Sequence, residues 1–232
     1  VQSAKEWNNH LHKWLRKRGF KSTGPDRCVY VRKWKDEKSD DTKTQVLGIF
    51  VDDGQAFGDD IESLQPELEQ AFNLRWLNEL NTMLGVHYTW KVENGMVRAV
   101  TLDQRAYILK MAEVFEKELE GVRPHSTPME PRQVLMSDGE NEDDELIDES
   151  IPYRSVVGSL LFLSRLTAPT LHFAVTQACR FSSAPRKSHW KAAIQILKYA
   201  IDNKDKLTIT YDNTVEYKGM YAFSDSEFAT QD

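Results

Sequence analysis

A short apolar run that ends in two adjacent carboxylates places the strongest constraint on how this chain can fold. The run extends from Gln45 to Val51, and its apolar members are β-branched, aromatic or large aliphatic residues, as a buried β-strand requires. Asp52, Asp53 and Gly54 follow directly, and a glycine at that point allows a tight turn. The sequence therefore predicts a β-hairpin with both aspartates at its exposed tip.

The two adjacent carboxylates have two interpretations. Two anionic side chains repel each other, and a divalent cation bound by their oxygen atoms offsets that repulsion. A solvated Asp-Asp-Gly turn with no bound ion is the simpler interpretation of the pair taken alone. The choice between them depends on the rest of the sequence.

The rest of the pattern predicts an α+β fold, in which helices cover an antiparallel sheet. Helical periodicity and glycine ends define the helices, and alternation around Asn94-Gly95 defines a hairpin. Asp59-Asp60 is expected to cap the helix that begins at Ile61. The expected elements are helices over residues 3–18, 61–72 and 104–119, strands over 27–34, 45–51, 85–92, 96–102, 207–211 and 217–223, and helical stripes that start near 153, 173 and 190.

The charge of the chain is unevenly distributed. Residues 137–150 contain eight acidic and no basic residues, and a flexible linker is expected there, whereas residues 1–35 contain ten Lys or Arg and two acidic residues. The formal net charge of −6 therefore hides a basic N-terminal region. Attraction to phosphate is screened over a Debye length of about 10 Å, so local patches decide nucleic-acid binding. A solvated basic helix face with no ligand explains any single lysine equally well.

The sequence around the acidic pair resembles a known family. Phe50-Val51-Asp52-Asp53 resembles the Tyr-x-Asp-Asp box of reverse transcriptases, which usually reads Tyr-Val-Asp-Asp in copia-type LTR retrotransposons. Other segments resemble that family in the same order along the chain. They are residues 6–12, 26–31, 151–163, 173–175, 189–192, 196–199 and 222–229.

The resemblance implies a partial polymerase palm followed by a helical thumb and connection region. The implied divisions are a partial palm over residues 1–103, a thumb-like helix and proline-rich exit over 104–136, an acidic linker over 137–150, a helical region over 151–205 and the first strands of an RNase H-like domain over 206–232.

The resemblance also implies a metal-dependent reaction. In the family, template-directed addition of deoxynucleotides to a primer uses two Mg²⁺ or Mn²⁺ ions about 4 Å apart. Asp52 and Asp53 match the metal ligands. Asp225 matches the first metal-binding aspartate of the RNase H domain, but that activity needs several carboxylates from later in the domain, so a vestigial position and no RNA cleavage are expected. The implied partners are an RNA or DNA template-primer and the rest of a Pol polyprotein. Weak contacts to a nucleic-acid backbone are expected from basic residues within 5–33 and from one arginine further along the palm range. These residues are Lys13, Arg16, Lys17, Arg18 and Arg75.

Three departures from the family lead us to expect a fragment that is inactive alone, unless the mature protein continues upstream of Val1. The family's third catalytic aspartate and its fingers match positions before Val1. Phe50 replaces the tyrosine of the box, and Gly54-Gln55-Ala56 replaces an apolar strand, which is expected to weaken the second arm of the hairpin. The alternative is a non-enzymatic retrotransposon relic or a recruited nucleic-acid- or protein-binding module.

The expected location is intracellular, in a cytoplasmic particle or the nucleus, as the resemblance implies. The two cysteines lack the spacing of a disulfide framework or a metal site, which favours a reducing compartment. The sequence shows no apolar run long enough to span a membrane and no leader, so no membrane partner is expected.

Overall fold

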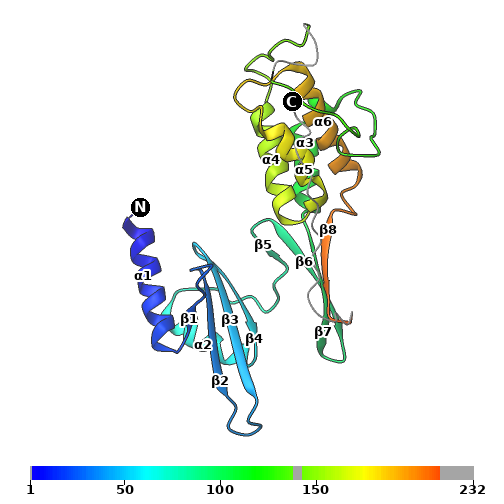
Figure 1. Cartoon of the computed structure of the whole chain (residues 1–232). Helices are drawn as coiled ribbons and strands as arrows, with labels where there is room; N and C mark the ends of the chain where they lie inside the picture. The colour runs from blue at the N-terminus through cyan, green and yellow to red at the C-terminus, as the bar shows by residue number, and fades with distance from the viewer. Residues whose placement is uncertain (1, 138–142, 215–232) are drawn as a thin grey trace, which may run out of the picture. The chain divides into compact units, whose positions relative to one another are not determined.

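The computed structural model describes residues 2–137 and 143–214 (Figure 1). The chain divides into two compact units, Val1–Met83 and Leu84–Asp232. The predicted palm range 1–103 therefore extends across both units. Within the described residues there are six α-helices and two four-stranded antiparallel sheets, which confirms the predicted α+β class.

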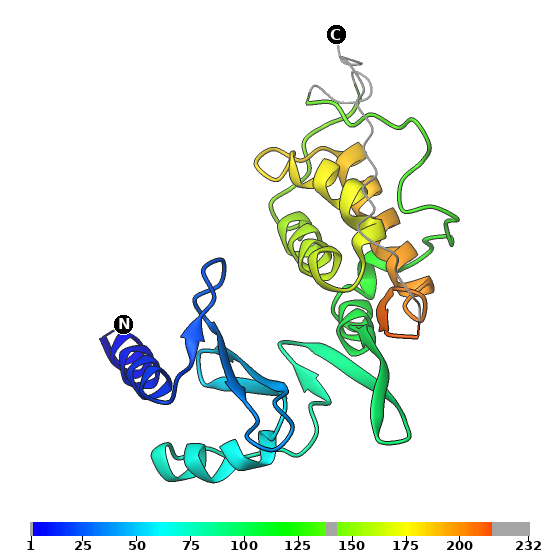
Figure 2. The same ribbon diagram turned by 60° about the horizontal axis from the view of Figure 1, so that its bottom comes forward.

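The first unit is a four-stranded sheet covered on one face by two helices. Its elements are α1 (Gln2–Lys17), β1 (Lys21–Ser22), β2 (Val29–Lys35), β3 (Thr42–Phe50), β4 (Asp53–Gly58), α2 (Ile61–Ala71) and β5 (Thr82–Met83). The first four strands pair in chain order. Both helices pack on the same side of the sheet, because their leucines join Tyr30 and Leu47 in one buried cluster. Figure 2 shows α1 and α2 beside this sheet.

Local sequence explains the ends of α1. Trp7, Leu11 and Leu15 recur at helical spacing and pack into the first core, as predicted. Gly19 adopts a φ of 82°, which glycine tolerates without strain. The amide of Phe20 then donates a hydrogen bond to the carbonyl of Leu15 at 3.1 Å, which is a Schellman-type helix end.

The second unit combines a helical bundle with a projecting sheet. Its elements are β6 (Val86–Glu93), β7 (Met96–Asp103), α3 (Arg105–Val114), η1 (Lys117–Leu119), α4 (Tyr153–Leu166), η2 (Pro169–Leu171), α5 (His172–Cys179), α6 (Lys187–Asp202) and β8 (Thr208–Asp212). Within this unit β6 pairs with β7 and β7 pairs with β8, both antiparallel. The turn at Asn94-Gly95 has positive φ at both residues, as predicted for that dipeptide. Among residues that the structure describes, no helix has the length and apolarity needed to cross a bilayer.

The helical stripes of the second unit form its core with one exception. Buried residues from α3, α4, α5 and α6 make a single apolar cluster. Phe173 begins one of the helical stripes that the sequence predicts for the core, but it is 69% exposed, and Val175 is buried instead. The prediction for Phe173 was wrong because a helix as short as α5 offers too few turns for its periodicity to fix which face is buried.

The acidic stretch is ordered where the structure describes it, contrary to the expected flexible linker. The Asp144 carboxylate is buried and accepts hydrogen bonds from the backbone amide and the hydroxyl of Ser188, at 2.9 and 2.6 Å. Leu146 forms a β-bridge with Arg186, and Glu145 pairs with Lys187 at 2.6 Å. These contacts place acidic side chains at the start of α6, where the helix dipole favours negative charge.

Candidate functional site

The Asp52-Asp53 pair lies at the tip of a complete β-hairpin. In the register of β3 and β4, Phe50 pairs with Asp53, so Val51 and Asp52 form a two-residue turn. Both aspartates are exposed. The predicted hairpin and its exposed tip are confirmed, but the turn does not use Gly54, which pairs with Ile49 inside β4.

The second arm of this hairpin is fully formed, so the expectation that it would be weakened was wrong. All six residues of β4 pair with β3. Ala56 packs against the first core, and Gln55 lies opposite Gly48. A Cβ atom at Gly48 would lie 3.1 Å from the Gln55 side-chain nitrogen. Gly48 therefore provides the space that allows a glutamine where the family has an apolar residue.

The base of the hairpin is fixed by a buried glutamine. The Gln45 carbonyl oxygen accepts two hydrogen bonds from the Arg32 guanidinium, at 3.1 and 2.6 Å. The Gln45 amide nitrogen donates to the backbone carbonyls of Asp59 and Asp60, at 2.8 and 3.0 Å. Gln45 is fully buried, so these bonds replace the hydrogen bonds to water that its amide group gives up on folding. They also hold the strand to the loop that leads into α2.

Gly58 is required where β4 ends. It adopts a φ of +114°, and a Cβ atom there would lie 2.1 Å from the carbonyl oxygen of Thr44. That carbonyl accepts a hydrogen bond from the amide of Asp59 at 2.9 Å. The Asp59 carboxylate in turn accepts from the Thr44 amide at 2.7 Å. No residue with a side chain fits at Gly58 without displacing these backbone groups.

The predicted capping role of Asp59-Asp60 was wrong. Asp60 occupies the N-cap position of α2 but its side chain forms no capping hydrogen bond. Its carboxylate instead lies 2.8 Å from the Lys43 ammonium, which also pairs with Asp36 at 2.8 Å. The Lys43 ammonium donates hydrogen bonds to the carboxylates of Asp36 and Asp60, and these bonds, with the one to Asp36 the stronger cause, raise the pKa of Lys43. The bond with Lys43 likewise lowers the pKa of Asp36.

A tryptophan of α1 contacts the acidic turn directly. The Trp7 indole N–H donates a hydrogen bond to the carbonyl oxygen of Val51 at 2.8 Å. The Trp7 ring packs edge-on against Phe72, with ring centroids 5.3 Å apart. Sequence reasoning placed Trp7 only on the apolar stripe of its helix, because a hydrogen bond between residues so far apart in the chain leaves no local signal.

The donor set at the turn matches part of a Mg²⁺ or Mn²⁺ site. Carboxylate oxygens are the ligands these hard cations prefer, and an octahedral site needs about six oxygen donors, several of them water. Asp52 and Asp53 provide two exposed carboxylates. Across residues 2–137 and 143–214, no group of three or more His, Cys, Asp or Glu side chains is placed to hold a metal ion.

The structure separates the predicted nucleic-acid contacts into two groups. Lys13, Arg16, Lys17 and Arg75 are exposed. Arg18 instead pairs with Glu67 at 2.7 Å, and its guanidinium lies 3.7 Å from the centre of the Trp14 ring. Arg16 and Lys17 are in the last turn of α1, where cations also complement the helix dipole.

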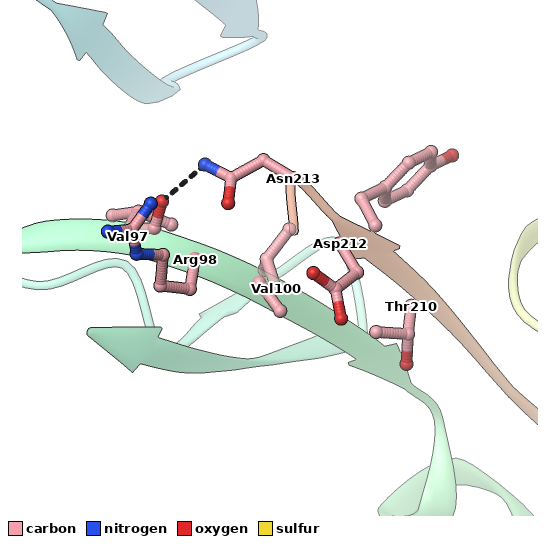
Figure 3. A pocket seen from close by; sticks show the side chains of 8 residues that line it. Val97, Arg98, Val100, Thr210, Asp212 and Asn213 are labelled. Atoms are coloured by element: carbon pink, nitrogen blue, oxygen red, sulfur yellow. Dashed lines mark hydrogen bonds between the residues drawn. The ribbon is translucent and has the colours of Figure 1, made fainter. Parts of the chain in front are cut away.

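A groove lies on the sheet of the second unit. This groove of about 460 Å³ is lined by residues 97–100 of β7 and 210–213 at the end of β8 (Figure 3). Asn213 bridges the strands, because its side chain donates to the Val97 carbonyl at 2.7 Å (Figure 3). A hydrogen bond from the Thr214 hydroxyl lowers the pKa of Asp212. None of the predicted site residues lines this groove, and Asp225 falls outside the described residues.

The fold and the site together define an α+β protein whose antiparallel hairpin carries two carboxylates at its tip. The chain is 27% identical over 206 residues to the "Retrovirus-related Pol polyprotein from transposon TNT 1-94" of Nicotiana tabacum, a match that covers 85% of this chain and 14% of that protein. It is 26% identical over 196 residues to a putative Ty5-1 transposon protein of Saccharomyces cerevisiae, covering 83% of this chain and 58% of the relative.

A shorter region of 82 residues is 32% identical to "Secreted RxLR effector protein 161" of Plasmopara viticola, covering 35% of this chain and 56% of that protein. No family model and no solved structure gives a significant match. The long matches confirm the resemblance seen in the sequence: this chain is homologous to retrotransposon Pol polyproteins, at modest identity. It spans 14% and 58% of the length of these two relatives.

Proposed function

We propose that this chain is a segment of a copia-type RNA-directed DNA polymerase and a part of a larger Pol polyprotein. The observation that carries the proposal is the β3–β4 hairpin, which presents Asp52 in an exposed two-residue turn and exposed Asp53 directly after it, at the start of β4. Homology to retrotransposon Pol polyproteins over most of the chain supports it. An unrelated protein with a chance Asp-Asp turn would lack this homology.

In this proposal Asp52 and Asp53 hold Mg²⁺ or Mn²⁺. When bound, such ions stabilise the charge on the attacking 3′-hydroxyl and on the leaving phosphate of a nucleotide. The chain's own contribution is to fix two carboxylates on a rigid hairpin, whose base is held by Gln45 and whose turn is contacted by Trp7. Sites built on rigid strands hold ligands more accurately than sites on loops.

The proposed nucleic-acid contacts are the exposed cations of α1 and Arg75. Lys13, Arg16 and Lys17 are available to phosphate groups, whereas Arg18 is already engaged by Glu67 and Trp14. Such contacts are electrostatic, so binding to a template-primer should weaken steeply as salt concentration rises. The proposed location is intracellular, in a cytoplasmic particle or the nucleus.

The second candidate is a non-enzymatic relic or a recruited binding module. One observation favours it: in the part of the chain that the structure describes, no third metal-ligating side chain joins the acidic pair. Both candidates keep a folded acidic hairpin. They differ in whether the carboxylates bind a metal ion.

Mn²⁺ titration of the full chain, followed by calorimetry or by the electron paramagnetic resonance of the free ion, tests the proposal. We expect Asp52→Asn and Asp53→Asn each to weaken binding at least about tenfold, equivalent to about 1.4 kcal/mol. The matched control is Asp40→Asn with Asp41→Asn, because this second adjacent pair is also exposed in a hairpin loop. If the control weakens binding as much as the site variants, the assignment is wrong.

A primer-extension assay on the same protein separates the two candidates further. We expect no extension above background from the isolated chain, because two carboxylates provide an incomplete metal site. Extension that Asp52→Asn abolishes would show a complete polymerase site and would reject the relic. Absence of Mn²⁺ binding by the parent chain would favour the module.

A further inference from the structure

The turn that carries the acidic pair has a backbone conformation that its own sequence disfavours. Val51 adopts a φ of 57°, and a β-branched residue in this left-handed region is a conformational outlier. The usual residues of a two-residue hairpin turn are Asn, Asp and Gly, which tolerate positive φ. The Val51 side chain is 65% exposed, so its burial contributes little that could offset this strain.

A contact from outside the hairpin offsets the strain. The Trp7 indole N–H donates to the Val51 carbonyl at 2.8 Å. This carbonyl belongs to the peptide that joins Val51 to Asp52, so the bond restrains the orientation of the peptide directly before the first carboxylate. The donor is itself held in place, because Trp7 is partly buried against the first core.

The position of Trp7 is set by an aromatic cluster around Phe72. Phe72 is buried at the end of α2, and the rings of Trp7 and Trp14 each lie 5.3 Å from its ring. His10 contacts the same ring at 5.7 Å. The cluster joins α1 to α2 without any residue of the hairpin. The position of the Trp7 indole therefore does not depend on its contact with the turn.

We propose that Trp7 is a positioning residue that holds the Val51–Asp52 turn in its left-handed conformation and thereby fixes the relative orientation of the Asp52 and Asp53 carboxylates. It does not bind the ligand itself. The effect on metal affinity rests on the proposed function of the acidic pair, whereas the effect on the turn does not.

The test uses Trp7→Phe in the full chain, which removes the N–H donor and keeps an aromatic ring against Phe72. The matched control is Trp14→Phe, which makes the same change on the same helix, beside the same ring. Amide hydrogen exchange of residues 50–53 without metal is the first measurement. We expect it to accelerate roughly three- to tenfold in Trp7→Phe and to stay at the parent rate in Trp14→Phe.

A second variant distinguishes positioning from simple packing. Val51→Gly removes the steric penalty of positive φ, so in that background Trp7→Phe should change the exchange rates much less. A packing role for Trp7 would not be rescued by a glycine in the turn. Equal acceleration in the Trp7 and Trp14 variants, or no rescue by Val51→Gly, would overturn the proposal.

Metal titration of the same variants then reports on the carboxylates. We expect Mn²⁺ affinity to fall about three- to tenfold in Trp7→Phe and to recover in the Val51→Gly background. If the parent chain binds no Mn²⁺, the proposed metal site is wrong, and the exchange measurement alone still decides the positioning role. If Mn²⁺ binds equally to parent and Trp7→Phe while the turn exchanges faster, the carboxylates are not positioned through the turn and the proposal fails.

Discussion

Replacing Gly58 by alanine should destabilise the first unit far more than the same substitution at Gly24 or Gly48. The new Cβ would lie 2.1 Å from the Thr44 carbonyl oxygen, and the backbone would remain at a φ of +114°. A side chain at such a φ costs about 1–3 kcal/mol. Overpacking against a neighbour that cannot easily move costs about 1–3 kcal/mol more.

The structure indicates that the Thr44 carbonyl cannot move without further loss. It accepts from the Asp59 amide, and the Asp59 carboxylate accepts from the Thr44 amide. Displacing this segment also disturbs the Gln45 bonds to Asp59 and Asp60, each worth about 1 kcal/mol. We therefore expect Gly58→Ala to lower the free energy of unfolding of the first unit by about 3–5 kcal/mol, the sum of these partly overlapping penalties.

Native-state hydrogen exchange is the suitable assay, because it reads each unit separately. Amides of β3 and β4 report on the first unit, and amides of α4 and α6 report on the second. The matched control is Gly24→Ala, where a Cβ meets no atom within 4 Å and the change should stay within about 1 kcal/mol. A Gly58→Ala variant as stable as Gly24→Ala would refute the reasoning.

Two further predictions concern the second unit. Asp144→Ala should destabilise it by about 2 kcal/mol, because the buried carboxylate accepts two hydrogen bonds from Ser188; thermal unfolding measures this, with exposed Glu149→Ala as a control near zero. Burial raises the pKa of Tyr153, whose hydroxyl donates to the Ala178 carbonyl. Folding therefore favours the neutral form of Tyr153. Its contribution to the free energy of unfolding is fully present below the unfolded pKa of about 10 and is lost as the pH rises through the higher folded pKa. Tyr153→Phe should reduce the loss of stability that urea unfolding detects as the pH rises above about 10, and an unchanged loss would contradict this reasoning.

Sequence reasoning succeeded where the determinants are local. Asn and Gly both tolerate the positive φ that a two-residue hairpin turn needs, so the hairpin at Asn94-Gly95 was predictable from the dipeptide. Gly19 marked the end of α1 for the same reason. The acidic hairpin was also predictable, because an apolar strand followed by Asp52-Asp53 leaves few alternatives for that segment.

The errors arose where distant contacts override local preference. Glycine is the better turn residue, so the turn was expected at Gly54, whereas the protein bends at Val51, where Trp7 supplies the compensating bond. Asp60 was expected to cap α2 but Lys43 holds its carboxylate. Asp144 lies in a stretch whose composition predicts disorder, but contacts with residues at the start of α6, among them Ser188, hold its described part in place.

The sequence predicted the two aspartates of the candidate site, but it did not predict the contacts that hold their hairpin in place. Asp52 and Asp53 followed from the motif, and their exposure agrees with it. The contacts of Trp7 and Gln45 required the structure, because each joins segments that are remote in the sequence. Arg18 was predicted to contact nucleic acid because of its charge, but in the structure its guanidinium forms an ion pair with Glu67.

The two hydrophobic cores have no residue in common, since one contains residues between 7 and 76 and the other residues between 107 and 207. Substitutions in different cores should therefore have additive effects on unfolding. Heating should give two separate melting transitions, in place of the single cooperative one of a small domain. Substitutions that destabilise the helical bundle should therefore accumulate in evolution without unfolding the acidic hairpin. A substitution scan of α3 to α6 should then be silent in a Mn²⁺ titration.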